Sequence, residues 1–168
     1  EKIRKSRNKR EISILQKAEK IIDVPHLIHS ENYEIIMEFI DGKKLAEVFN
    51  SLDKKERLNI CRLIGKQLAL LHNNNIIHGD LTTSNMILKD KKVYFIDFGL
   101  SFIDTKEEHK AVDLHLLRQA IESKHYEHYN ETFKNILESY KENSDNPEKI
   151  LDRLDVVEGR GRYKNKKK

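Results

Sequence analysis

Apolar spacing in the first forty residues changes from helical to strand-like. Residues 2–20 place Ile12, Leu15 and Ala18 on one side of a helix. Two short apolar runs follow Pro25 and are of strand length, which predicts a β-hairpin. The expected strands are HLIHS (26–30) and YEIIMEFI (33–40), with a turn at Ser30–Asn32.

From residue 41 onward the pattern is mainly helical. Asp41-Gly42 marks a turn before a short helix through Leu45 and Val48. Asp53, with Glu56 three residues later, is typical of a capping box and predicts a helix that runs to about His72. The side chains of this helix expected in the core are Leu63, Ile64, Leu68 and Leu71. Further helices are expected at 108–123, 127–141 and 147–157, the last beginning at Asn146-Pro147.

Charge is distributed unevenly along the 168 residues, whose formal net charge is +4. Residues 1–10 carry +5 and residues 160–168 carry +6, so the body is acidic and both ends are basic. Basic ends are either simply solvated or bind an anionic partner such as nucleic acid. No apolar run approaches the roughly 18 residues of a membrane span, and the start is charged rather than apolar. We therefore expect a cytoplasmic protein in which the single Cys61 is a buried structural thiol.

The candidate chemistry lies in IIHGDLTTSNMIL (76–88) and YFIDFGLS (94–101). The strands MILK and VYFI, joined by a tight turn at Asp90–Lys91, return the chain so that Asn85 and Asp97 flank one cavity. Phosphoryl transfer needs a metal on the phosphates and a carboxylate that orients the attacking hydroxyl. Mg²⁺ prefers hard oxygen ligands. We predict that Asp80 orients or accepts from the hydroxyl and that Asn85 and Asp97 hold the metal.

These motifs resemble the catalytic loop and D-F-G of the protein-kinase superfamily. The resemblance implies an α+β fold with a partial N-lobe (1–40), a mostly helical C-lobe (41–159) and a basic tail (160–168). It implies that MEFIDG (37–42) is the hinge, with Met37 as gatekeeper and the backbone of Glu38 and Ile40 facing adenine. It also places Glu11 as the glutamate of the αC helix and Asp113 as the buttress of the catalytic loop. His78, two residues before Asp80 in the sequence, is expected to orient the backbone of the catalytic loop.

The match is closer to the small atypical kinase of the KEOPS complex, on LTTSNMIL, the short segment after DFGLS, KAVDL and the RGR tail. This resemblance implies a serine/threonine kinase or ATPase that uses ATP and Mg²⁺ and supports tRNA threonylcarbamoyladenosine modification. The implied partners are the threonylcarbamoyl transferase subunit, sometimes fused upstream, a small regulatory subunit, and tRNA through the complex; no membrane is implied. Arg160 and Arg162 of the tail are expected to contact tRNA, the active site or the partner.

Two departures from ordinary protein kinases matter. Gly79 replaces the usual arginine before Asp80, and no A-P-E follows, so control by phosphorylation of an activation loop is not expected. A Gly-rich phosphate loop and a strand lysine are not found in the sequence, and we expect both upstream of Glu1. Two alternatives stay open: a small-molecule phosphotransferase of the aminoglycoside type, which shares HGD-x-x-x-x-N, and a non-catalytic scaffold that binds RNA.

Overall fold

The computed structural model describes residues 2–31 and 34–165, with the side chains of 8–31 and 34–160. The helices are α1 Lys2–Ala18, α2 Leu45–Val48, α3 Lys54–Asn73, α4 Glu107–Lys124, α5 Tyr129–Asn143 and α6 Pro147–Asn165. The strands are β1 Leu27–Glu31, β2 Glu34–Met37, β3 Lys43–Lys44, β4 Ile76–Ile77, β5 Met86–Lys89, β6 Lys92–Phe95 and β7 Phe102–Ile103. Three 3₁₀ turns are η1 Phe49–Ser51, η2 Thr83–Asn85 and η3 Tyr126–His128.

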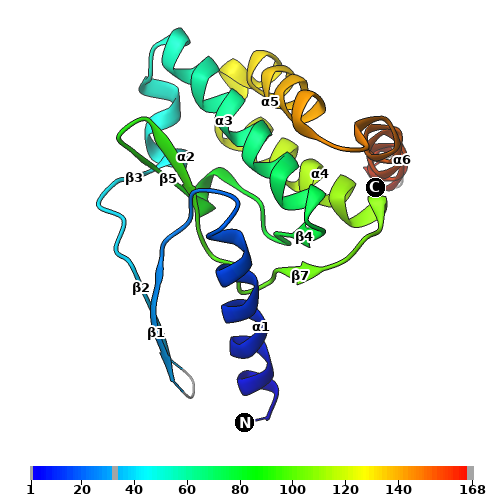
Figure 1. The fold of residues 1–168 in the computed structure, drawn as a ribbon. Helices are drawn as coiled ribbons and strands as arrows, with labels where there is room; N and C mark the ends of the chain where they lie inside the picture. The colour runs from blue at the N-terminus through cyan, green and yellow to red at the C-terminus, as the bar shows by residue number, and fades with distance from the viewer. Residues whose placement is uncertain (1, 32–33, 166–168) are drawn as a thin grey trace.

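The molecule has a narrow arm and a larger helical part (Figure 1). In the arm, α1 lies beside the antiparallel hairpin of β1 and β2. In the larger part, α3 packs along α5, and α6 packs on α4. Two small antiparallel sheets connect these layers, in the orders β3-β5-β6 and β4-β7. The fold is therefore α+β, with the strands of the larger part lying beneath its helices.

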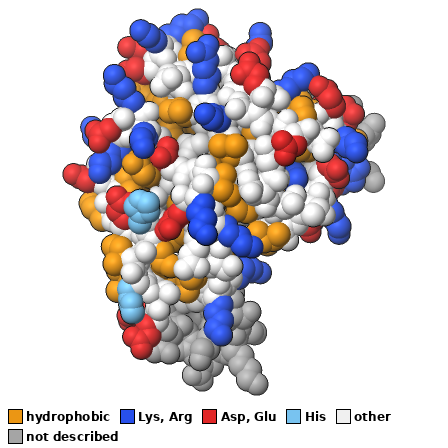
Figure 2. All heavy atoms as spheres, in the orientation of Figure 1, with side chains coloured by type: hydrophobic (Ala, Val, Ile, Leu, Met, Phe, Trp, Pro, Cys, Tyr) orange, Lys and Arg blue, Asp and Glu red, His pale blue; other side chains and the backbone are white. Residues whose placement is uncertain are grey.

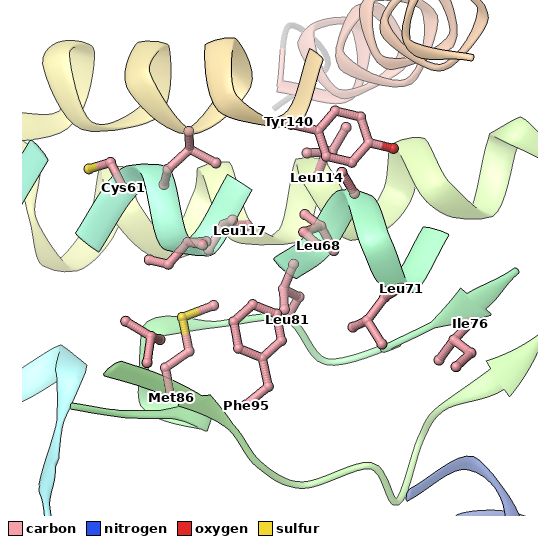
Figure 3. Close-up of a cluster of buried hydrophobic side chains, with 14 of the residues drawn as sticks. Cys61, Leu68, Leu71, Ile76, Leu81, Met86, Phe95, Leu114, Leu117 and Tyr140 are labelled. Atoms are coloured by element: carbon pink, nitrogen blue, oxygen red, sulfur yellow. The ribbon is translucent and has the colours of Figure 1, made fainter. Parts of the chain in front are cut away.

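The main core forms where the helices meet the β5–β6 hairpin. Figure 3 shows Leu68 of α3, Leu117 of α4 and Tyr140 of α5 above Met86 and Phe95 of the hairpin. All five are fully buried. Burying one such side chain contributes about 1.5–3 kcal/mol, so this cluster fixes how the hairpin sits against the helices. Cys61 is buried as expected, and burial raises the pKa of its thiol to about 12.

Most predicted elements are confirmed, with differences at their ends. The capping box of α3 is present, because Asp53 Oδ1 accepts from Glu56 N at 2.8 Å and Glu56 Oε2 accepts from Asp53 N at 3.2 Å. The predicted end of the last helix at 157 is wrong, since α6 continues to Asn165 and includes the first part of the basic tail. The strand expected over 33–40 is shorter, and the predicted turn at Ser30–Asn32 lies partly outside the described residues.

Gly65 allows α3 and α5 to approach each other closely. A Cβ added at Gly65 would lie 2.3 Å from Ile136 O and 2.8 Å from Ser139 Cβ, both on α5. The obstructing oxygen belongs to the backbone of a helix, so it cannot move aside as a flexible side chain does. A side chain at this position must therefore push the two helices apart.

We predict that Gly65→Ala lowers the free energy of unfolding by about 1–3 kcal/mol, because overpacking shifts the α3–α5 contact. The matched control is Gly159→Ala, where nothing lies within 4 Å of the added Cβ. In that helical position alanine should raise the free energy of unfolding by about 0.5–1 kcal/mol. Urea unfolding of the two variants measures both values, and equal effects would contradict the close helix approach.

Candidate active site

Asp80 and Asn85 are held together by the loop that follows β4. The amide nitrogen of Asn85 donates to Asp80 O at 2.8 Å and to Asp80 Oδ2 at 2.9 Å. Asn85 ends the 3₁₀ turn η2, and its own backbone oxygen accepts from Ile96 N at 3.0 Å. Because the amide nitrogen is occupied, the side-chain oxygen of Asn85 is the atom that remains for a metal ion.

Asp97 follows β6 in a backbone conformation that most residues avoid. Its φ is +63°, in the left-handed region, where aspartate is found more often than most residues. This turn exposes the carboxylate, whose Oδ1 accepts from Gly99 N at 3.4 Å. The hydrogen bond from Ile96 N to Asn85 O joins the residue that precedes Asp97 to the last residue of the catalytic loop. Hydrogen bonds thus connect Asp80 to Asn85, and Asn85 to the residue that precedes Asp97. That the three side chains form one metal-binding and catalytic site stays a prediction.

Glu11 of α1 faces the same turn. A Cβ added at Gly99 would lie 3.3 Å from Asp97 Oδ1 and 3.7 Å from Glu11 Oε2, so both carboxylates border Gly99. Partial burial raises the pKa of Glu11, and the negative charge of Asp97 raises it further. Two carboxylates of like charge beside one glycine favour a cation between or near them.

The donor set fits Mg²⁺. It consists of the Asn85 amide oxygen and the exposed Asp97 carboxylate, both hard oxygen ligands, with Asp80 adjacent. Among residues 8–31 and 34–160, no three or more His, Cys, Asp or Glu side chains are grouped to hold a metal ion. A magnesium site with two protein ligands needs water or phosphate oxygens as well, and this is how Mg²⁺ is commonly bound next to nucleotide phosphates.

The side chain of Asp113, on α4, holds the backbone of the catalytic loop in place. Its Oδ2 accepts from His78 N at 2.7 Å and its Oδ1 from Gly79 N at 2.9 Å. Its Oδ2 also accepts from His72 Nε2 at 3.2 Å. The carboxylate is fully buried, and three donors compensate for its loss of water. These contacts support the buttress role expected of Asp113.

His78 joins the catalytic loop to the strand that precedes Asp97. Its Nδ1 accepts from Asp80 N at 3.3 Å, so its Nε2 carries the proton and donates to Ile96 O at 3.1 Å. Burial lowers the pKa of His78 and favours this neutral form. Gly79 next to it has φ +83°, and an added Cβ would lie 2.6 Å from Leu100 O. An arginine in place of Gly79 would therefore be strained.

The segment after D-F-G is short and tightly held. β7 pairs with β4, and Ser101 Oγ donates to His78 O at 2.7 Å while Asp104 N donates to Asn75 O at 2.9 Å. Ser101 is fully buried in this arrangement. The contacts hold the segment in place without a phosphate group.

The predicted hinge residues have only some of their backbone hydrogen-bonding groups free to bind adenine. Glu38 N already donates to His26 O at 2.8 Å, and Ile40 O accepts from Gly42 N at 2.9 Å. Among the backbone hydrogen bonds of the described residues, Glu38 O and Ile40 N take no part, and these are the groups left for adenine. Met37 is 37% exposed and Ile40 is buried. The adenine contacts of these residues stay a prediction.

The tail arginines are placed differently. Arg160 is in α6 and its Nη1 lies 2.6 Å from Glu108 Oε1 of α4. Glu108 also pairs with Arg153, which lies seven residues earlier on the same face of α6. In this structure Arg160 therefore ties α6 to α4 rather than reaching the active site, while the side chain of Arg162 lies outside the described residues.

A second hydrogen-bond network, with Thr83 and His125 buried in it, was missed by sequence reasoning. Asn50 Nδ2 donates to Lys124 O, so Asn50 Oδ1 accepts from His125 Nδ1 at 2.7 Å. His125 Nε2 then accepts from Thr83 Oγ1 at 3.0 Å, and Thr83 lies in η2 with Asn85. His125 therefore uses both ring nitrogens in hydrogen bonds. The partners are 42 and 75 residues away in the sequence, so no local pattern could identify them.

This chain is similar to known proteins over nearly its whole length. Residues 1–122 match the family model of the RIO domain. The KEOPS complex subunit Bud32 of Pyrococcus abyssi is 44% identical over 170 residues, which cover 98% of this chain and 77% of that protein. The EKC/KEOPS complex subunit bud32 of Dictyostelium discoideum is 37% identical, covering 98% of this chain and 69% of that protein. The chain belongs to the Bud32 family of RIO-domain proteins.

Two further similarities bear on length and fold. This Bud32-family chain is 40% identical to a probable bifunctional tRNA threonylcarbamoyladenosine biosynthesis protein of Methanobrevibacter smithii, but spans only 30% of it. WaaP, solved in complex with acyl carrier protein, has a TM-score of 0.66 at 11% identity, covering 92% of this chain and 76% of WaaP. The expected α+β, protein-kinase-like fold and the family resemblance are confirmed. Within the described residues, no helix has the length and apolar character needed to span a membrane.

We predict that Thr83→Val lowers the free energy of unfolding by about 1–3 kcal/mol, because His125 Nε2 loses its buried donor. Valine keeps the size of threonine, so the effect reports the hydroxyl. Thr82→Val, one residue earlier and half-buried, is the matched control, since Thr82 makes no side-chain cap hydrogen bond to η2. Urea unfolding that gives equal values for the two variants would contradict the network.

Acid should destabilise the protein through its buried neutral histidines. Burial lowers the pKa of His72, of His78 and of His125, the last to about 4. Below about pH 6.5 these histidines are protonated in the unfolded chain but stay neutral in the folded chain. Stability is thus complete above pH 6.5 and falls toward pH 4, by at most roughly 1.4 kcal/mol per pH unit for each histidine. Urea unfolding between pH 7.5 and 4.5 should give a flatter stability profile for His125→Asn than for the wild type, and equal slopes would contradict the buried neutral histidine.

Proposed function

We propose that this chain is the ATP-binding, kinase-like subunit of a KEOPS-type assembly that supports threonylcarbamoyladenosine modification of tRNA. The observations that support the proposal are the hydrogen bond from Asn85 to Asp80 and the position of Asp97 and Glu11 on either side of Gly99. The names of the Bud32 and bifunctional relatives supply the biological setting. The proposed partners are a threonylcarbamoyl transferase subunit, a small regulatory subunit and tRNA, in the cytoplasm.

In this proposal Asn85 and Asp97 hold Mg²⁺, which when bound neutralises charge on the phosphate oxygens. Asp80 orients the attacking hydroxyl, which belongs to water in an ATPase or to a serine or threonine in a protein kinase. Asn85 donates to Asp80 Oδ2, which leaves Asp80 Oδ1 to accept from that hydroxyl. Glu38 O and Ile40 N are proposed to bind the adenine edge.

The segment after D-F-G is held in a fixed position, which supports the proposal that the assembly regulates this enzyme. Ser101 and β7 are fixed against the catalytic loop, and Gly79 has no room for the arginine that would bind a phosphate on this segment. We propose that turnover is changed by partner binding instead. Activity that rises when the transferase subunit is present follows from this view.

We predict that Asp80→Asn and Asp97→Asn reduce Mg²⁺-dependent ATP turnover about 10²–10⁴-fold, because each removes a carboxylate that the transfer step uses. The measurement uses the full-length protein, with and without the transferase subunit and tRNA. Asp90→Asn is the matched control: its carboxylate lies in the exposed β5–β6 turn, and its φ of +49° suits asparagine. Wild-type turnover in both site variants would refute the catalytic proposal, and absent turnover with intact partner binding would favour a scaffold.

A further inference from the structure

A cavity of about 890 Å³ lies where α3 begins beside the β5–β6 turn. Its apolar wall includes Leu52, Leu58 and Leu88. Leu52 and Leu88 also pack against the main core, so the wall is held in place by the core. None of the residues lining this cavity, which we name the basic groove, belongs to the Asp80–Asn85–Asp97 site.

The rim of the basic groove is positively charged. Lys54, Lys55, Arg62 and Lys91 line it, against the carboxylates of Glu56 and Asp90. Glu56 is engaged in the capping box, and Lys54 pairs with Glu131 at 2.8 Å. Among ion pairs of the described residues, none involves Lys55, Arg62 or Lys91. These three cations are available to an incoming ligand.

The cations continue along one face of α3. Lys55, Arg62 and Lys66 are separated by seven and four residues, which places them on the same side of the helix, and all three are exposed. Residues 11–159 nevertheless carry a net charge of −7. Figure 2 shows Lys and Arg side chains around apolar surface at the upper left, where α3 begins. The groove is thus a locally basic, partly apolar surface on an acidic body.

We propose that the basic groove docks an acidic segment of a partner protein that carries apolar anchor residues. The anchors enter the leucine-lined cavity, and the acidic residues face Lys55, Arg62 and Lys91. A single-stranded RNA is the other anionic class, but RNA recognition uses aromatic or arginine platforms for the bases. The residues lining the groove include one arginine, Arg62, but no aromatic side chain, and the apolar wall is aliphatic, which favours the protein segment.

The test uses a fluorescent 14-residue probe peptide in which leucines at i, i+3 and i+7 are flanked by glutamates. We expect it to bind the full-length protein, measured by fluorescence anisotropy, more weakly as salt increases. Lys55→Glu combined with Arg62→Glu should weaken binding at least about tenfold, since roughly 1.4 kcal/mol is tenfold and two charge contacts are reversed. Leu58→Ser, which removes apolar wall from a half-buried position, should weaken it severalfold.

The matched control is Lys134→Glu combined with Lys149→Glu, exposed positions on α5 and α6 that change the net charge equally. This control should retain binding within about twofold of the wild type, which separates the groove from net charge. Equal losses in the two double variants, or no binding of the probe, would overturn the proposal. Binding of a uridine 15-mer that is lost in the groove variant but not in Leu58→Ser would replace it with an RNA site. ATP turnover of the groove variant should be unchanged, so either proposal can fail without the other.

Discussion

The buried carboxylate of Asp113 is the contact on which the site depends. It receives two backbone N–H groups of the catalytic loop and the ring of His72, which in turn accepts from Tyr140 OH at 2.8 Å through Nδ1. An isolated carboxylate in this environment would be costly, so the loop and the charge hold each other in position. α3, α4 and α5 thereby meet at the base of the loop that carries Asp80.

A chain of hydrogen bonds extends from Asp113 through His78 to the predicted metal ligands. His78 donates to Ile96 O, Ile96 N donates to Asn85 O, and the Asn85 amide donates to Asp80. On the far side of η2, Thr83 is fixed by His125 and Asn50. A site fixed from two sides is preorganised, which is what electrostatic stabilisation of phosphoryl transfer requires.

Two carboxylates of like charge lie beside this rigid site. Glu11 and Asp97 both border Gly99, and the pKa of Glu11 is raised by burial and by Asp97. The arm that carries Glu11 and the larger part that carries Asp97 therefore gain from a cation at this point. Nucleotide with magnesium would couple the two parts, while the basic groove on α3 offers a separate surface for a partner.

Local patterns along the chain predicted most of the helices and strands, and they suggested the candidate site. Helical spacing, the capping box at Asp53 and the motif pair around Asp80 and Asp97 are local patterns, and local patterns follow from backbone periodicity and hydrogen bonding between near neighbours. Packing between distant segments, in contrast, decided that α6 continues into the basic tail as far as Asn165 and pairs with Glu108, and that His125 supports Thr83. It also decided that two-residue strands β4 and β7 pin the segment after Asp97. These features join residues tens of positions apart, where packing, and not local propensity, selects the partners.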